Sequence, residues 1–158
     1  MLNPNLNLGG TVSLANTSVI AGTTSTYTTG AASVHVIDGK FGTALAAQTN
    51  TASPTTDATT GTAFVALADD EACTLVFGVN LAGAIQLSQG AKTNIEPGTT
   101  TLLITPPFPS LPNDFCPIGY AIIKNDSGSA FTTGTTSWSA IDSTFVDVAM
   151  MPDRPQAS

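Results

Sequence analysis

Ionisable side chains are scarce in this chain. Asp, Glu, Lys and Arg together make up only 9% of its 158 residues, and His35 is the single histidine. Enzymes rely largely on these residue types to move protons, hold metal ions or bind phosphate groups. Their scarcity therefore argues against an enzyme, and it favours a protein that acts through its surfaces.

Positive charge is scarcer still, because four Lys and Arg residues stand against eleven Asp and Glu, for a formal net charge of −7. Nucleic acids are bound mainly through clustered Lys and Arg side chains, so we expect no contact with nucleic acid. No apolar run approaches the roughly 18 residues of a membrane-spanning helix, and no charged start precedes a short apolar segment. Neither a membrane contact nor an export signal is expected.

Metal-ligating residues are also few. A zinc site takes about four ligands, which the two distant cysteines, Cys73 and Cys116, and one histidine do not supply, so no metal or cofactor is expected. Buried free thiols are favoured for the two cysteines in a reducing cytosol, and a disulfide between neighbouring strands is the alternative. In both cases the cysteines are predicted to be structural.

No catalytic group is predicted. His35 has no second histidine to work with, and the sequence suggests neither a nucleophile nor an orienting partner near it. Asp69, Asp70 and Glu71 form the densest acidic cluster, but consecutive residues of a turn point in different directions, which favours a solvated turn over a cation site. A pair of carboxylates that meets only in the fold, as in glycosidases, remains the enzymatic alternative.

Helical periodicity is absent, since no segment of about ten residues or more repeats its apolar positions as an amphipathic helix does. Abundant Thr with short apolar runs favours strands instead. We predict an all-β fold of about eight to ten strands, an antiparallel β-sandwich, jelly roll or barrel. Residues 1–30 are predicted to form an extended N-terminal arm or edge strand, residues 31–150 the β-domain, and residues 151–158 an extended C-terminal tail.

Turn residues divide the β-domain. Asp38-Gly39 between two apolar runs predicts a two-residue hairpin, because glycine accepts the positive φ of a type I′ turn. Further turns are expected at residues 80–83 and 125–128, and residues 48–62 are expected to form a loop. The expected strands are residues 33–37, 40–45, 63–67, 73–79, 84–89, 99–104, 115–123, 131–139 and 144–148.

Several apolar residues lack an obvious place in the core. Even spacing puts the leucines of the first ten residues on one face of an extended segment, and the proline-rich connector at residues 106–112 is extended as well. We predict a homotrimer or another cyclic oligomer, in which the arm adds a strand to a neighbouring sheet edge; a frayed terminus is the alternative. The candidate interface residues are Leu2, Leu6, Leu8, Phe108, Leu111, Met150 and Met151.

Four stretches resemble a known family: residues 72–90 (ACTLVFGVNLAGAIQLSQG), 106–125 (PPFPSLPNDFCPIGYAIIKN), 134–138 (GTTSW) and 145–155 (FVDVAMMPDRP). Over residues 64–155 the chain resembles the capsid decoration (cement) proteins of tailed bacteriophages. The resemblance implies a β-rich, commonly trimeric domain that is made in the bacterial host cytoplasm. It would sit on the outer capsid surface of the virion, where it bridges subunits of the major capsid protein without any catalytic residue.

A module of another class is the alternative. A carbohydrate- or receptor-binding domain of a phage fibre or spike would expose aromatic rings for stacking on sugars. Trp138 and Tyr120 would then lie on the surface, with Phe131 and Phe145 as further members of the platform. Aromatic residues in a β-protein more often belong to the core, so this function is the second choice.

Overall fold

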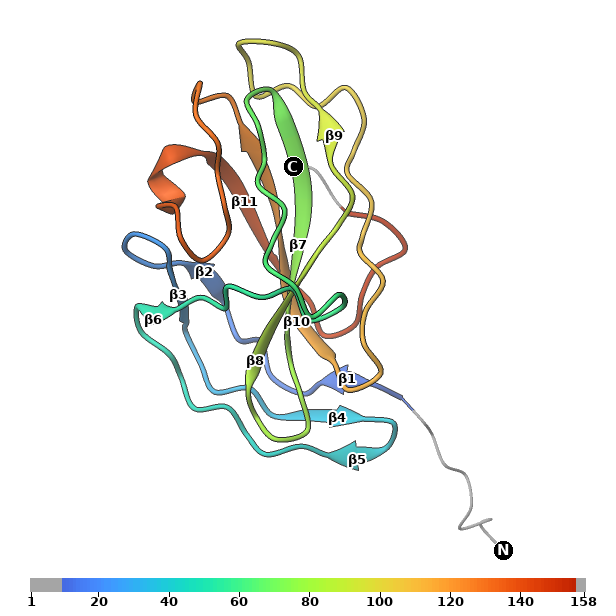
Figure 1. Cartoon of the computed structure of the whole chain (residues 1–158). Coiled ribbons are helices and arrows are strands. Elements are labelled where there is room, and N and C mark those ends of the chain that lie inside the picture. Colours follow the sequence, from blue (N-terminus) through green and yellow to red (C-terminus); the bar gives the residue numbers. More distant parts are fainter. Residues whose placement is uncertain (1–9, 156–158) are drawn as a thin grey trace, which may run out of the picture.

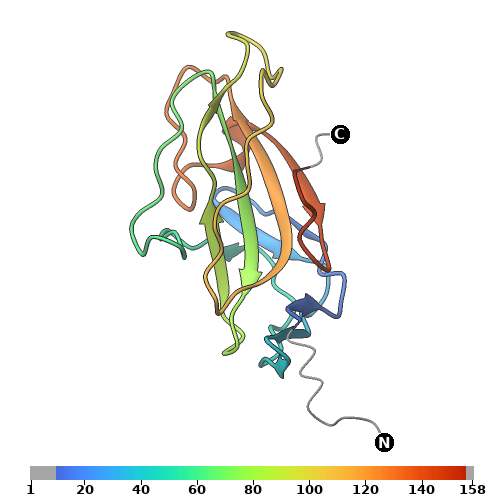
Figure 2. The ribbon, with the colours of Figure 1, turned by 90° about the vertical axis from the view of Figure 1, so that its right-hand side faces the viewer.

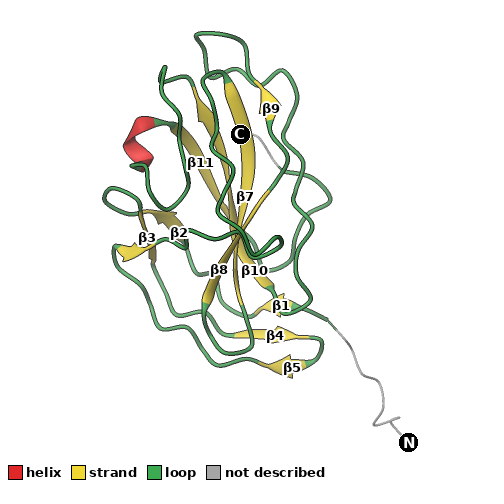
Figure 3. Cartoon of the chain, in the orientation of Figure 1, coloured by secondary structure: helices red, strands yellow, loops and turns green. Residues whose placement is uncertain are grey.

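The computed structural model describes residues 10–155 and is all-β, as predicted. Three antiparallel sheets pack together in a manner consistent with a β-sandwich, and the described residues form no closed barrel (Figure 1). Long loops join the strands, and one 3₁₀ turn at Trp138–Ala140 is the only helical element of the described part (Figure 3). The strands are β1 (Val12–Ser13), β2 (Val19–Ala21), β3 (Thr26–Thr29), β4 (His35–Ile37), β5 (Lys40–Phe41), β6 (Thr51–Ala52), β7 (Glu71–Val79), β8 (Ile85–Gln89), β9 (Thr93–Asn94), β10 (Cys116–Asn125) and β11 (Asp142–Asp147).

The central sheet has the order β11-β10-β7-β8, with β9 pairing beside the start of β7. Strand β7 is buried on both faces, which explains why its sequence is nearly all apolar rather than alternating. Leu75 and Phe77 belong to one core cluster, whereas Val76 between them belongs to a second cluster on the other face. The sheet therefore needs a cover on each side.

The first face is covered by the sheet β2-β3-β6 and by the loop that carries the tryptophan. Tyr27 of β3 lies 6.5 Å from Phe77 between ring centroids. The Trp138 ring lies 5.5 Å from Phe131 and 5.6 Å from Phe145, and its indole N–H donates a 2.8 Å hydrogen bond to the Thr26 carbonyl. Aromatic packing thus joins segments that lie far apart in the sequence.

The second face is covered by irregular chain. The proline-rich connector lies across it, with Phe108 edge-on to Tyr120 at 5.0 Å between ring centroids. The Thr74 hydroxyl of β7 donates to the Pro106 carbonyl at 3.1 Å, which fixes the connector to the sheet. Gly78 is required here, because a Cβ at this position would lie 2.2 Å from a carbon of the Phe115 ring. The predicted extended connector is therefore packed on its own domain.

The third sheet, β1-β4-β5, closes one end of the domain and runs across the long strands (Figures 1 and 2). Its hairpin confirms the predicted turn, with φ of 49° at Asp38 and 75° at Gly39. On the inner side of this sheet, His35 and Ile37 are buried. The His35 ring nitrogen Nε2 lies 2.9 Å from the Asn80 carbonyl oxygen, to which it donates because a carbonyl can only accept.

Some predicted strands are wrong. In residues 131–139 only Phe131 pairs, through one bridge to Leu67, and the chain then turns through Gly134 at a φ of 78°. Residues 99–104 and 63–67 likewise contribute only isolated bridges. Apolar and Thr-rich runs have the composition of strands wherever they lie, but these ones find no continuous neighbouring strand with which to pair.

The first described residues contribute to the core. Residues 10–30 form β1, β2 and β3, and they place Val19 and Tyr27 in the core. Strands β1 and β2 are each the outer strand of their sheet. Residues 1–9 lie outside the described residues.

Candidate interaction surfaces

The outer side of the sheet β1-β4-β5 is a continuous apolar surface. Val12 pairs with Val36, and Val36 pairs in turn with Phe41, so these three side chains share one side of the sheet. The Leu14 N–H donates a 2.7 Å hydrogen bond to the Val34 carbonyl, which continues the same register. We call this surface the apolar end face; it consists of Val12, Leu14, Val34, Val36 and Phe41.

The apolar end face is open to solvent in the single chain. Phe41 is 77% exposed, Leu14 54% and Val34 40%. None of its five residues is charged. The neighbouring Lys40 pairs with Ile37 and therefore points to the opposite side of the sheet. Exposed apolar side chains that are grouped in this way, rather than scattered singly, make the apolar end face a candidate contact surface.

Sequence reasoning missed this surface as a unit. The signal was present in the alternation of Val34 and Val36 with His35, because alternate residues of a strand point to opposite sides. The hairpin turn at Asp38-Gly39 then sets the register that brings Phe41 opposite Val36. What the sequence did not indicate is which side of this hairpin faces the core.

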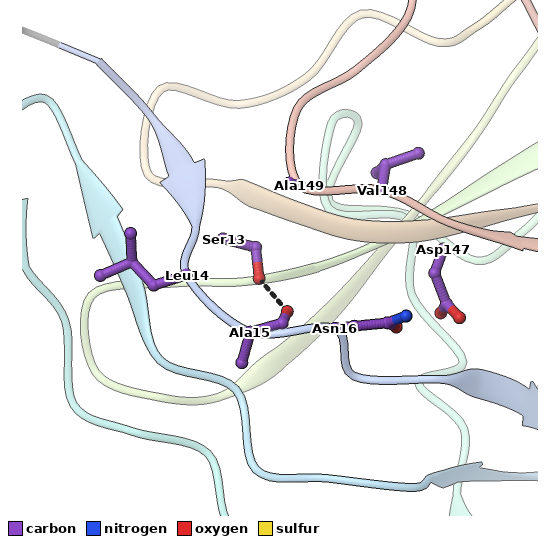
Figure 4. A pocket seen from close by; sticks show the side chains of 7 residues that line it. All are labelled: Ser13, Leu14, Ala15, Asn16, Asp147, Val148 and Ala149. Carbon is purple, nitrogen blue, oxygen red and sulfur yellow. Dashed lines mark hydrogen bonds between the residues drawn. The ribbon is translucent and has the colours of Figure 1, made fainter.

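A groove lies beside the apolar end face (Figure 4). It has a volume of about 250 Å³, with Leu14 at one end and Asp147 at the other. Residues 13–16 and 147–149 line the groove, and a 2.9 Å hydrogen bond from the Ser13 N–H to the Ala149 carbonyl joins these two segments. The Asp147 carboxylate accepts the Val19 N–H at 2.8 Å and therefore serves the backbone. Among the described residues that line the groove, Asp147 is the only one with an ionisable side chain.

The candidate interface residues have separate locations. Phe108, Leu111 and Met151 are partly buried against the second core cluster of their own domain. Met150 is 65% exposed and directly follows Ala149, whose carbonyl is bonded to β1. The remaining three, Leu2, Leu6 and Leu8, lie outside the described residues.

The acidic triplet organises turns. The Asp69 carboxylate accepts the Gly128 N–H at 2.9 Å, and that of Asp70 accepts the Gly98 N–H at 3.0 Å. Glu71 pairs with Lys92 at 2.7 Å; burial opposes its ionisation, but the hydrogen bonds from Lys92 and from the Ala68 N–H outweigh this and lower its pKa. Within residues 10–155, no three His, Cys, Asp or Glu side chains are placed to hold a metal ion.

Both cysteines are free and buried, so the favoured interpretation is confirmed and the disulfide alternative is wrong. Burial raises the pKa of the Cys73 thiol to about 12 and that of Cys116 to about 11. Thiols in such surroundings stay protonated and unreactive at neutral pH. They fill space in the core.

Three of the four aromatic residues proposed for a sugar platform are buried in the core, and Phe145 packs against that core partly buried. Trp138 is 4% exposed, while Tyr120 and Phe131 are each 1% exposed. The Trp138 indole N–H is also occupied by a backbone carbonyl. These rings cannot stack on a sugar in this structure, which removes the feature on which the carbohydrate-binding alternative depended.

Comparison with known proteins gives no direct assignment. No family model matches the chain, and no curated protein and no solved structure is significantly similar to it. In the part of the chain that the structure describes, no helix is long and apolar enough to cross a membrane. The function is therefore inferred from the residues of the chain itself.

Proposed function

We propose that the protein is a non-enzymatic structural protein of a phage virion, which decorates the outer capsid surface and bridges subunits of the major capsid protein. The observation that carries the proposal is the apolar end face, an uncharged contact surface on a domain whose side chains offer little catalytic chemistry. The resemblance of residues 64–155 to decoration proteins supplies the partner.

The composition suits a protein that lies against others over a large area. Charged residues are depleted in the cores of protein interfaces, because charges lose their hydration on contact. Here charged residues are only 9% of the whole chain, so most surface positions are Thr, Ser, Asn or Ala. Desolvating such a surface costs less free energy than desolvating one covered with Lys and Glu.

The stabilising effect would come from mass action. A ligand that binds only the assembled shell favours the shell over separated subunits. Each binding site stabilises the shell by a free energy of RT ln(1 + [L]/Kd). At a concentration 100 times its Kd, one such ligand contributes about 2.7 kcal/mol. Many copies on one shell add these contributions, so weak individual contacts suffice.

The test compares virions of the encoding phage with and without the protein. We expect particles that lack the protein to lose an outer layer of density in electron micrographs and to release their DNA at a lower temperature. Adding purified protein back should restore both properties and reach saturation at a fixed copy number per capsid. Normal density and unchanged heat resistance without the protein would refute the role.

A substitution refines the same experiment. Phe41→Ser changes a side chain that is 77% exposed, so it should leave the fold intact, and it should weaken recovery of heat resistance if the apolar end face contributes to assembly on the shell. Ile104→Ser is the matched control. Ile104 is 69% exposed and lies next to Thr93 of β9, at the opposite end of the domain from the sheet β1-β4-β5 (Figure 1). Equal recovery with both variants would show that the apolar end face has no part in it.

A further inference from the structure

We propose that the apolar end face is the docking site for residues 1–9 of a second copy of this chain, so that neighbouring copies exchange their N-terminal segments. The proposal does not depend on the capsid role, because it concerns the purified protein alone. It identifies the apolar end face as the surface that would bind the leucines of the N-terminal arm.

The two surfaces match in pattern. Residues 1–9 read MLNPNLNLG, with Leu2, Leu6 and Leu8 at even positions and asparagine at positions 3, 5 and 7. An extended segment with this period has one apolar and one polar side. The apolar end face has five apolar side chains and no charge, and residues 1–9 contain no charged side chain either. Docking would bury leucines against valines and Phe41 and would keep the asparagines in solvent.

The origin of the segment supports the match. Gly10 lies at the hairpin turn of the same sheet, where its carbonyl accepts the Gly39 N–H at 3.4 Å. The Thr11 hydroxyl accepts the Asp38 N–H there, also at 3.4 Å. These contacts hold the chain alongside the turn as it enters β1. The segment that precedes Gly10 therefore starts at the rim of the apolar end face.

The direction of the chain favours a second copy over the same one. Because Gly10 and Thr11 run past the hairpin turn in line with β1, covering the face of the same chain would require a complete reversal immediately before Gly10. Nine extended residues span about 30 Å, whereas three strands measure only about 14 Å across. The segment is thus long enough to reach the corresponding face of a neighbour without reversing.

Backbone pairing adds to the contact. Among residues 10–155, strand β5 is the outer strand of its sheet and pairs only with β4, so within this part of the chain one side of its backbone is open to an added strand. The part of the segment that reaches this edge, after crossing the apolar end face, would pair with it beside Phe41. In a closed ring every copy donates one segment and receives one, which leaves no face uncovered.

The first experiment measures mass by light scattering coupled to gel filtration, at micromolar concentrations of full-length protein. We expect an oligomer for the wild type and for Ile104→Asp, and the mass of one chain for Phe41→Asp and for a chain that lacks residues 1–9. A monomeric wild type overturns the proposal. An oligomer that survives both the truncation and Phe41→Asp overturns it as well.

The second experiment distinguishes exchange from folding back. Chains carrying Leu6→Cys and differently tagged chains carrying Val34→Cys are co-expressed and treated with a short thiol cross-linker; Cys73 and Cys116 are buried and need not be removed. We expect cross-links between the two kinds of chain, and at least tenfold fewer when Ile104→Cys replaces Val34→Cys. A link found only within one chain that carries both Leu6→Cys and Val34→Cys would overturn the exchange.

Discussion

Asn125 is expected to be the polar residue on which the stability of the domain depends most. It ends β10 with no exposed surface, and its Nδ2 lies within 3.1 Å of the carbonyl oxygens of Leu67, Ala68 and Ser129. Its Oδ1 accepts the Ser127 hydroxyl at 2.7 Å. One side chain thus holds two loops at the end of the central sheet.

The magnitude for Asn125→Ala follows from the bonds that are lost. Two N–H groups and one well-formed accepted bond, at about 1 kcal/mol each, give roughly 3 kcal/mol of lost stability. The Leu67 carbonyl keeps its bond from the Phe131 N–H, and the carbonyls of the exposed Ala68 and Ser129 can rehydrate, so no larger penalty is expected. For a chain of this length the loss lowers the melting temperature by about 6–12 °C.

Asn125→Asp sharpens the test, because a carboxylate has no N–H to donate and would face three carbonyl oxygens. The introduced carboxyl would keep its proton to higher pH in the folded than in the unfolded chain, so stability is lost as pH rises through its raised folded pKa. We expect this variant to be less stable than Asn125→Ala at pH 7 and to recover at pH 4. Urea unfolding followed by tryptophan fluorescence measures both.

Asn16→Ala is the matched control, since Asn16 is exposed and accepts one local bond from the Ser18 N–H at 3.1 Å. It should cost less than about 1 kcal/mol. The reasoning fails if Asn125→Ala costs no more than this control, or if Asn125→Asp matches the wild type at pH 7.

Three further predictions concern the core. Gly78→Ala should destabilise the protein by about 1–3 kcal/mol or more, because the added methyl would meet the Phe115 ring. At Gly98 an added methyl would meet open space, so Gly98→Ala should cost only about 1 kcal/mol of backbone strain. Equal unfolding midpoints for the two variants would contradict this. Cys73 and Cys116, with pKa values raised to about 12 and about 11, should not react with an aromatic disulfide reagent at pH 8 until the protein is denatured. Because the folded state keeps these protons longer than the unfolded state, stability should fall as pH rises above the ordinary thiol pKa of 9.0, and constant unfolding midpoints from pH 8 to pH 10 would refute it.

The fold class and the centre of the sheet were predictable from sequence. Strands β7 and β10 lie in long apolar runs, and the turn at Asp38-Gly39 has a residue pair with a strong conformational preference. A long apolar run or an Asp-Gly pair predicts its local structure well because few other conformations suit that sequence. The predicted strand around Trp138 fails because its side chain is anchored by distant partners, the Thr26 carbonyl and two rings, which no local pattern contains.

The surfaces were harder to predict than the strands. Phe108 and Leu111 were named as candidate interface residues, and the structure shows them partly buried against the second core cluster of their own domain. Val34 and Phe41 look like ordinary strand residues, and only the packing of His35 and Ile37 inward shows that they point to solvent. Exposure depends on which side of a sheet the rest of the chain covers, and this is a property of the whole fold.

The way this domain protects its sheet edges bears on the apolar end face. Many proteins guard edges with lysine, but this chain has too few charges to do so. Strands β6 and β9 are two residues long. At the edge of β8, the Gln89 side-chain amide donates to the Val65 carbonyl and accepts the Val65 N–H, as a neighbouring strand would. Short strands and an uncharged side chain therefore limit edge pairing at β6, β8 and β9. A chain protected in this way against unspecific association would lose that protection if it left Leu14, Val34 and Phe41 exposed beside the half-buried Val12 and Val36. This reasoning supports the proposal that a particular partner covers the apolar end face.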